Sequence, residues 1–264
     1  SEAMRKKMGG KTFIKNPILG TKFTIAISSA KGGVGKSTFA TNIALALKKT
    51  GCKVGLLDAD IYGPSIPKMI GINEKPHSDG QKIETINRYG LSTMSMGYMV
   101  NDENPIIWRG LMVMKAINEM IDKVNWGAAE IMVIELPPGT GDVQLSLIQK
   151  LKISGSLIVT TPQDIALIDV IRGLKMFEKT KVPILGIVEN MSTHICSSCG
   201  FEEDIFGSGG GVAIATEYNT ELLGQWPLAH GIRQQADRGN PTVVSEPDGQ
   251  AAQTMMEVAR NVIA

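Results

Sequence analysis

The sequence has no apolar run close to the roughly 20 residues that a membrane-spanning helix needs. No signal-peptide pattern opens the chain, so we expect a cytoplasmic protein with no membrane partner. The formal net charge is only +1 and the pI is near 7.6, which leaves no basic field to attract nucleic acid. Three cysteines are too few and too unevenly placed for a disulfide framework, so we expect them to be free thiols or metal ligands.

The rest of the composition is that of an ordinary folded protein. Apolar residues make up 43% and charged residues 20% of the 264 residues. Neither an internal repeat nor a low-complexity linker divides the chain. We therefore predict an N-terminal arm over residues 1–20, which is basic and weakly patterned, followed by a single domain over residues 21–264.

Strand patterns alternate with helical patterns along the chain. The predicted strands are 23–29, 53–58, 91–96, 130–136, 155–160, 183–189 and 222–226, and the predicted helices are 36–49, 106–124, 142–151, 164–179 and 248–263. This alternation predicts an α/β fold, with a mainly parallel sheet of about seven or eight strands and helices on both faces. The segment 192–211 interrupts the alternation, and we interpret it as an inserted functional loop.

A glycine-rich segment, AKGGVGKST over residues 30–38, follows the first predicted strand and opens the first predicted helix. Its backbone N–H groups can turn toward one anion, and the helix N-terminus adds partial positive charge. Lys36 would then meet the β- and γ-phosphates of ATP, and the Ser37 hydroxyl can bind Mg²⁺. The residues expected to bind the nucleotide are Gly32, Gly33, Val34, Gly35, Lys36, Ser37 and Thr38. This order of strand, loop and helix predicts a phosphate-binding loop (P-loop).

Acidic side chains follow two further predicted strands. Asp58 and Asp60 leave a strand end on the same side, where one can support Mg²⁺ and the other can orient the attacking water. A turn acid or a helix cap is the alternative for either aspartate alone. Glu135 ends the strand over 130–136 and would approach Mg²⁺ through water. Gly139 and Gly141 permit the following loop to move with the γ-phosphate.

Cys196 and Cys199 form a C-x-x-C in a turn-prone segment. Two thiolates at this spacing can bind one metal ion or cluster, but a complete site needs four ligands. Two subunits across a symmetry axis would supply four cysteines, which suits one [4Fe–4S] cluster or one structural Zn²⁺. A redox dithiol or an inert pair are the alternatives. His194 could also complete a site within one chain.

These motifs resemble a known family. In order along residues 20–245, the chain contains KGGVGKST, DADIYGPSIP, WRG, LPPGTGD and GIVENMS, followed by the C-x-x-C. They are similar to those of the Mrp/ApbC-type iron–sulfur cluster carriers, in the deviant Walker A branch of P-loop ATPases. The resemblance implies an ATPase that acts as a homodimeric carrier and delivers a [4Fe–4S] cluster to apo iron–sulfur client proteins. ATP hydrolysis would be the conformational switch, and Zn²⁺ would fill the same cage in protein purified aerobically.

The resemblance also implies roles for residues near the phosphates. Lys31 would be the signature lysine that reaches the partner's nucleotide and neutralises charge on the transferred phosphoryl group. Lys36 would share that catalytic task, and Asp60 would position the hydrolytic water. Asp58 and Ser37 would serve the magnesium ion.

The resemblance also implies which residues contact the adenine base. Asn190 would hydrogen-bond the adenine, and Pro227 and Leu228 would line the base pocket.

The sequence departs from the family pattern at two positions. Ala30 stands where the general loop pattern has its first glycine, and we expect nucleotide binding to survive this change. Glu135 stands where the family has aspartate, and its extra methylene moves the carboxylate by about 1.5 Å. That shift predicts slow or altered hydrolysis at a Mg²⁺ site of strict geometry.

Two other classes of protein offer competing interpretations. Membrane-positioning ATPases need a basic amphipathic C-terminal helix, but the tail over 251–260 holds one basic residue. DNA-partition ATPases need a basic surface, which the net charge disfavours. Electron-transfer proteins like the nitrogenase iron protein take one cysteine from each of two distant loops rather than using a C-x-x-C.

Overall fold

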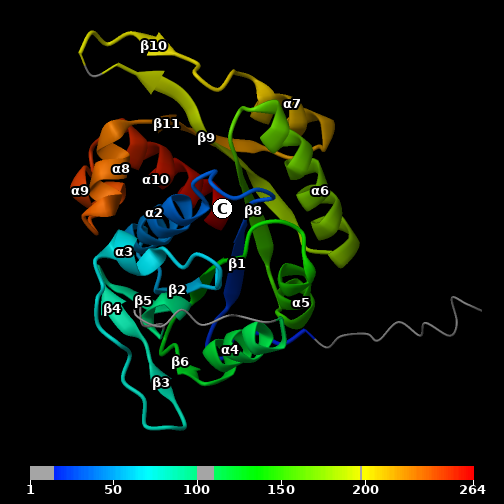
Figure 1. The fold of residues 1–264 in the computed structure, drawn as a ribbon, viewed down its shortest axis with the longest axis vertical. Coiled ribbons are helices and arrows are strands. Elements are labelled where there is room, and N and C mark those ends of the chain that lie inside the picture. The colour runs from blue at the N-terminus through cyan, green and yellow to red at the C-terminus, as the bar shows by residue number, and fades with distance from the viewer. Residues whose placement is uncertain (1–14, 100–109, 197) are drawn as a thin grey trace, which may run out of the picture.

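The chain folds around one large twisted sheet (Figure 1). The structure is a computed structural model that describes residues 15–99, 110–196 and 198–264. Within these ranges the sheet has nine strands in the order β10-β9-β8-β1-β7-β2-β5-β4, with β11 pairing with β9. They are β1 (Phe23–Ser28), β2 (Val54–Asp58), β4 (Ile86–Arg88), β5 (Leu91–Ser95), β7 (Ile131–Glu135), β8 (Gly155–Thr160), β9 (Ile184–Ile195), β10 (Glu202–Glu203) and β11 (Leu222–Leu228). Two short strands, β3 (Ile83–Glu84) and β6 (Val124–Asn125), form a separate pair.

The predicted mainly parallel α/β fold is confirmed. Every pair in the large sheet is parallel except β4 with β5 and β10 with β9, which lie toward its two edges. The strands β2, β7 and β8 are buried along their whole length, as expected for a sheet covered on both faces. All seven predicted strands are present. The short edge strands β4 and β10 were not predicted.

Helices cover both faces of this sheet (Figure 1). They are α2 (Lys36–Lys49), α3 (Ile66–Ile70), α4 (Gly110–Asp122), α5 (Asp142–Lys150), α6 (Asp164–Thr180), α7 (Gly210–Glu217), α8 (His230–Asp237), α9 (Thr242–Ser245) and α10 (Gln250–Ile263), with a 3₁₀ turn over Met96–Tyr98. One face carries α2 and α10, which pack on each other, and the other carries α4, α5 and α6. The predicted helix over 106–124 appears as α4, and residues 106–109 lie outside the described residues.

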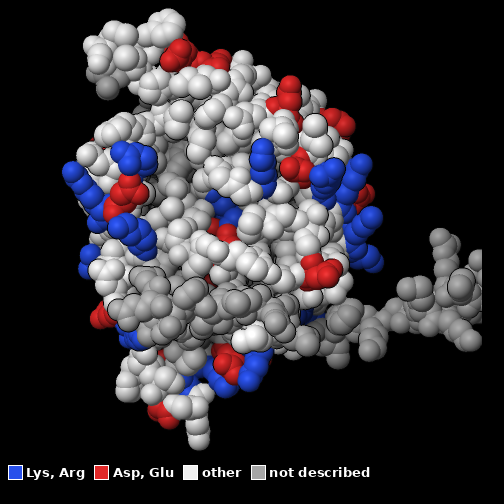
Figure 2. All heavy atoms as spheres, viewed as in Figure 1, with Lys and Arg blue, Asp and Glu red and all other residues white. Residues whose placement is uncertain are grey.

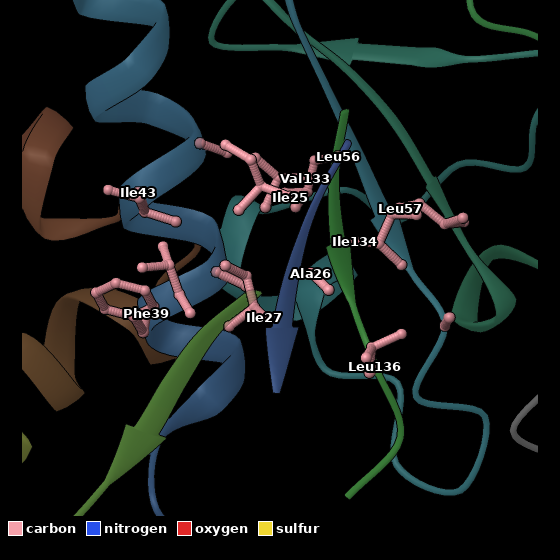
Figure 3. Close-up of a cluster of buried hydrophobic side chains, with 14 of the residues drawn as sticks. Ile25, Ala26, Ile27, Phe39, Ile43, Leu56, Leu57, Val133, Ile134 and Leu136 are labelled. Carbon is pink, nitrogen blue, oxygen red and sulfur yellow. The ribbon is translucent and has the colours of Figure 1, made fainter. Parts of the chain in front are cut away.

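The core fixes the first helix against the centre of the sheet (Figure 3). Phe39 and Ile43 come from α2, which lies beside Ile27 of β1, whereas Ile134 and Leu136 lie on the far side of β1. All five side chains are fully buried. Burial of such large apolar side chains contributes about 1.5–3 kcal/mol each, so the segment joining β1 to α2 is held between two rigid elements.

The segment 192–211 differs from the predicted inserted loop. β9 extends to Ile195 and β10 pairs antiparallel with its end, while α7 already begins at Gly210. The strand continues past residue 189, where its pairing with β8 ends, because β11 pairs with it up to His194. Residues 192–203 of the segment are therefore a hairpin that extends the sheet rather than a loop, and its role as a functional insertion stays a prediction.

The end of the predicted N-terminal arm packs against the domain. Asn16 forms a β-bridge with Leu151, and Ile18 is buried. Residues 1–14 of the arm lie outside the described residues. No helix in the described ranges is both long enough and apolar enough to cross a membrane.

Candidate nucleotide site and cysteine hairpin

The glycine-rich loop lies between β1 and α2, at the carboxyl end of the central strand. Gly33 and Gly35 have φ values of +83° and +85°, a backbone region that favours glycine. α2 begins at Lys36, and its N-cap, Gly35, provides no side-chain hydrogen bond to the first turn. The first amides of the helix have no partner within the helix, so the loop has the features of an anion site.

A cavity of about 290 Å³ opens over this loop, at the lower end of the volumes typical of small-molecule sites. Its lining includes Gly32, Gly33, Lys36, Ser37, Asp60 and Pro138. The structure thus brings the loop together with an acid from the end of β2 and with the segment after β7. The site lies at the carboxyl ends of neighbouring parallel strands, as the topology requires.

Carboxylates hold the two side chains that we expect to bind phosphate and magnesium. Lys36 Nζ donates to Asp60 Oδ2 at 3.0 Å and also to Glu135 Oε1. Ser37 Oγ donates to the same oxygen of Glu135. Lys36 is 6% exposed and Glu135 is completely buried. In this structure the side chains of Lys36 and Ser37 are therefore held by carboxylates of the same chain.

The pKa values of this cluster reflect burial and mutual attraction. Burial acts to lower the pKa of Lys36, but the charges of Glu135 and Asp60 outweigh it and raise the pKa. Burial raises the pKa of Glu135 against the attraction of Lys36. Burial, and then repulsion from Glu135, raise the pKa of Asp58 well above its usual range. Three carboxyl groups thus surround one ammonium, an arrangement that favours an additional cation.

Two buried oxygens in the cluster support a magnesium site. Glu135 Oε2 and Asp60 Oδ1 have no hydrogen-bond partner among the described residues. An unpartnered buried acceptor is costly, and carboxylate oxygens are the hard ligands that Mg²⁺ prefers. The residues present therefore fit a Mg²⁺ ion held by Ser37 and Glu135.

Asp58 accepts hydrogen bonds with both of its carboxylate oxygens. Its Oδ1 accepts from the Asp60 N–H at 3.1 Å, and its Oδ2 accepts from the Ile66 N–H at 3.3 Å and from Ser95 Oγ at 2.9 Å. Both oxygens hold the segment that follows β2, and the side chain is completely buried. Asp58 thus places Asp60 at the cavity, and its contact with magnesium stays a prediction.

Lys31 lies at the front of the loop with its side chain half-buried. Its Nζ makes no hydrogen bond or ion pair with any residue that the structure describes. Two hydrogen bonds hold the backbone near Lys31. Ser29 Oγ donates to the Lys31 carbonyl, and the Gly139 N–H donates to the Ser29 carbonyl at 3.0 Å. The loop after β7 therefore contacts the P-loop directly, and the role of Lys31 toward a second subunit stays a prediction.

The residues predicted for the adenine side lie on β9 and β11. Asn190 Nδ2 donates to the Val34 carbonyl at 2.8 Å, while its Oδ1 has no partner within the described ranges. Pro227 and Leu228 are half-buried on β11, the neighbour of β9. The structure brings Asn190 to the P-loop, and the contacts of these three residues with the base stay predictions.

The two cysteines lie on the turn of the β9–β10 hairpin. The Cys196 N–H donates to the Phe201 carbonyl at 2.8 Å, and the Gly200 N–H donates to the Cys196 carbonyl at 2.9 Å. Cys196 is half-buried and Cys199 is exposed. Hydrogen bonds from the backbone of Ser198 and Cys199 lower the pKa of the Cys196 thiol. This favours the thiolate, which is the form that binds metals.

The described residues of one chain gather no complete set of metal ligands at this hairpin. No group of three or more His, Cys, Asp or Glu side chains that could bind a metal occurs in residues 15–99, 110–196 and 198–264. His194 Nδ1 lies 3.0 Å from the Leu228 carbonyl and so engages the backbone of β11. A tetrahedral site needs four ligands, so the predicted metal role of Cys196 and Cys199 requires two more, and that role stays a prediction.

Sequence reasoning missed two serines that shape the nucleotide site. Ser95 ends β5 and anchors Asp58, and Ser29 links the P-loop to the loop after β7. Both follow the rule that functional side chains gather at the carboxyl ends of parallel strands. That rule could have identified both, because Ser29 ends the predicted strand 23–29 and Ser95 is the next-to-last residue of the predicted strand 91–96.

The parallel sheet and the loop opening α2 define a P-loop NTPase. More narrowly, the chain belongs to the family described as ParA, NUBPL iron-transfer P-loop NTPase, whose model matches residues 20–263. It is 52% identical over 249 residues to the iron-sulfur cluster carrier protein of Escherichia coli strain K12, covering 94% of this chain and 68% of that protein. It is 45% identical over 252 residues to the iron-sulfur cluster transfer protein NUBPL of Mus musculus, covering 94% and 79%.

Solved structures agree with this assignment. A nucleotide-binding protein from Archaeoglobus fulgidus, in complex with ADP, is 35% identical with a TM-score of 0.74, covering 87% of this chain and 90% of that chain. The cell division ATPase MinD from Pyrococcus furiosus has a TM-score of 0.69 at 20% identity, covering 92% and 99%. The second similarity shows the fold alone. The resemblance noted from the motifs is thus confirmed at the level of the family.

Proposed function

We propose that this chain is an ATP-binding homodimeric carrier that holds an iron–sulfur cluster between two copies and transfers it to apo-proteins. One observation carries the proposal: a hairpin presents Cys196 and Cys199 at the surface, and the described residues of one chain add no third ligand. The names of the related carrier and transfer proteins support the same cargo.

Two copies would complete the metal site. Four cysteines from two hairpins match the ligand set of a [4Fe–4S] cluster, and the same sulfurs would bind Zn²⁺ in its place. Ile195 and Phe201 flank the cysteine turn and are 46% and 63% exposed. Burial of these apolar side chains between two hairpins would stabilise the pairing and limit the access of water to the cluster.

ATP binding would open the charge cluster of the P-loop. Lys36 would leave Asp60 and Glu135 to bind the β- and γ-phosphates, which frees Asp60 to orient the attacking water. Ser37 and Glu135 would hold Mg²⁺, which neutralises phosphate charge when bound. Lys31 from the second copy would stabilise the charge that develops on the transferred phosphoryl group. Because Glu135 holds both Lys36 and Ser37 beforehand, we expect slow hydrolysis.

The structure offers no support for the positioning or partition classes. The C-terminal helix α10 buries Met255 and Val258 and packs on α2 and β11, so its apolar face is already occupied. Basic and acidic side chains are interspersed over the face that Figure 2 shows. Our proposal accordingly includes neither a nucleic acid nor a membrane as partner.

Anaerobic reconstitution with iron and sulfide tests the proposal. We expect one four-iron centre per two chains, measured by absorption spectroscopy, iron counting and the mass in solution. Replacing Cys196 and Cys199 by serine should abolish loading and transfer. Cys52→Ser is the matched control and should retain both, because Cys52 contacts Thr50 in the turn before β2, away from the hairpin. A double variant that loads and transfers cluster normally, or a strictly monomeric loaded protein, overturns the proposal.

A further inference from the structure

The strand β9 connects the P-loop to the cysteine hairpin. It runs for 12 residues, contacts the loop through Asn190 and leads directly into Cys196. At about 3.3 Å per residue, Asn190 and Cys196 are separated by at most roughly 20 Å along this strand. Figure 1 shows β9 leaving the centre of the molecule and ending in the hairpin with β10. β11 runs beside this stretch and pairs with it from Asn190 to His194.

The contact at the P-loop fixes one peptide unit. The Val34 carbonyl that accepts from Asn190 belongs to the same peptide group as the Gly35 N–H. The described peptide bonds are trans, so this N–H points away from the carbonyl. Gly35 also lines the cavity over the loop. The Asn190 side chain thus sets the orientation of an amide available to a phosphate.

The space between Gly35 and β9 is too small for any side chain at residue 35. A Cβ atom at Gly35 would lie 2.1 Å from Asn190 Nδ2 and 4.0 Å from the Met191 Cε. A displacement of the loop is therefore transmitted to β9, because no free space separates the two segments.

Strain follows directly after this contact. Met191 has a φ of +57°, in the left-handed region that a non-glycine residue seldom adopts inside a strand. Backbone strain of this kind is concentrated in switch regions and ligand clamps. The pairing with β11 also slips here: Trp226 pairs with Asn190, but Leu228 pairs with His194, so β9 contains two additional residues. Pro227 lies in this gap and has no N–H to donate.

Two side chains anchor β9 to β11 within the slip and at its end. Ser192 Oγ donates to the Trp226 carbonyl at 3.2 Å, and His194 Nδ1 lies 3.0 Å from the Leu228 carbonyl. His194 and Ile195 then pair with Glu203 and Glu202 of β10. The hairpin and the P-loop are thus two well-held regions joined at one strained residue.

We infer that Asn190 and Met191 form a joint through which occupation of the P-loop sets the orientation of the cysteine hairpin. Asn190 is the positioning residue that senses the Val34–Gly35 peptide, and Met191 is the strained link. This inference rests on the proposed function only in taking the hairpin as the metal-binding end. It predicts that nucleotide and metal affinities are coupled, by the same factor in both directions.

The test measures Zn²⁺ binding to the reduced, metal-free protein with and without saturating ADP and Mg²⁺. For the unmodified chain we expect ADP to change the Zn²⁺ dissociation constant by about fivefold or more, the usual size of allosteric coupling. Met191→Gly permits the left-handed backbone without strain and loosens the joint, so the factor should fall to about one while Zn²⁺ still binds. Asn190→Asp replaces the donor with an acceptor facing the Val34 carbonyl and should also remove the coupling.

Lys181→Gly is the matched control, because Lys181 has a φ of +55° at the end of α6 and lies outside β9. It should retain the full factor. The inference is overturned if Met191→Gly and Asn190→Asp both retain the coupling, or if the unmodified chain shows none. Failure of the proposed function gives a different result: Zn²⁺ binding that is unaffected when Cys196 and Cys199 are replaced by serine.

Discussion

The P-loop and the cysteine hairpin are held in opposite ways. In the P-loop, Lys36 and Glu135 are buried and joined by ionic hydrogen bonds, in a site that one chain builds almost completely. The hairpin ends in an exposed cysteine and an exposed Phe201, with backbone hydrogen bonds as its main support. Charged groups that neutralise one another within one chain can be buried, whereas thiols that are proposed to meet a second copy must stay at the surface.

The largest effect should follow from removal of the buried ammonium. We expect Lys36→Met to lower the free energy of unfolding by about 3–5 kcal/mol near pH 8, because it leaves buried carboxyl groups without their cation. Burial holds the folded-state pKa of Glu135 above its unfolded value, so the folded state takes up a proton more readily as the pH falls. The loss of unfolding free energy caused by Lys36→Met should therefore be smaller at pH 5 than at pH 8. Urea denaturation of both proteins at the two pH values would measure it.

Lys22→Met provides the control for this comparison. Lys22 pairs with Glu130 at 2.7 Å, but both side chains are solvent-exposed. We expect little change in stability at either pH, because exposed ion pairs contribute little. Equal losses for the two variants would contradict the view that burial makes the P-loop cluster distinctive.

A smaller effect should follow from shortening the acid that closes the P-loop. Glu135→Asp retracts the carboxylate and weakens its hold on Lys36 and Ser37. Loss of one hydrogen bond to a charged group destabilises the nucleotide-free state by about 1.5–3 kcal/mol. That corresponds to binding of ADP with Mg²⁺ that is about ten- to 150-fold tighter. Isothermal titration calorimetry would measure this, with Glu130→Asp as the exposed control. Unchanged or weaker binding would show that Glu135 does not compete with the nucleotide.

The smallest effect on the isolated chain should occur at the hairpin. Replacing Cys196 and Cys199 by serine should leave the metal-free denaturation curve unchanged, because neither thiol packs in the core. Zn²⁺ should stabilise the unmodified chain, by mass action, but not this variant. A thermal shift titration would check both points. A metal-free variant that unfolds markedly earlier would assign the cysteines a structural role instead.

Sequence patterns were sufficient for most of the nucleotide end. The residues of the P-loop are contiguous, so their spacing reveals a local structure that depends little on the rest of the chain. The positions of Asp60 and Glu135 at one edge of the sheet followed from strand-end topology. The ion pair of Lys36 with Glu135 did not, because those residues are 99 positions apart and their contact depends on side-chain length and burial.

The secondary structure of the hairpin could not be predicted from sequence patterns in the same way. β10 is only Glu202–Glu203, which has no apolar alternation, and its pairing depends on β9 rather than on its own propensity. α8 was missed for a similar reason, because none of its residues is buried. The positive φ of Met191 has no signal in the sequence, since methionine has no preference for that region.

The order of residues alone was enough to establish a P-loop protein with a parallel sheet and a surface cysteine pair. Local spacing and hydrophobic periodicity encode these features, which depend little on contacts with distant segments of the chain. Folding alone decided that the loop is closed by its own carboxylates, that Asp58 positions Asp60, and that one strand links the loop to the cysteines. Those contacts join residues far apart in the chain, so only the packing of the whole sheet brings them within hydrogen-bond distance.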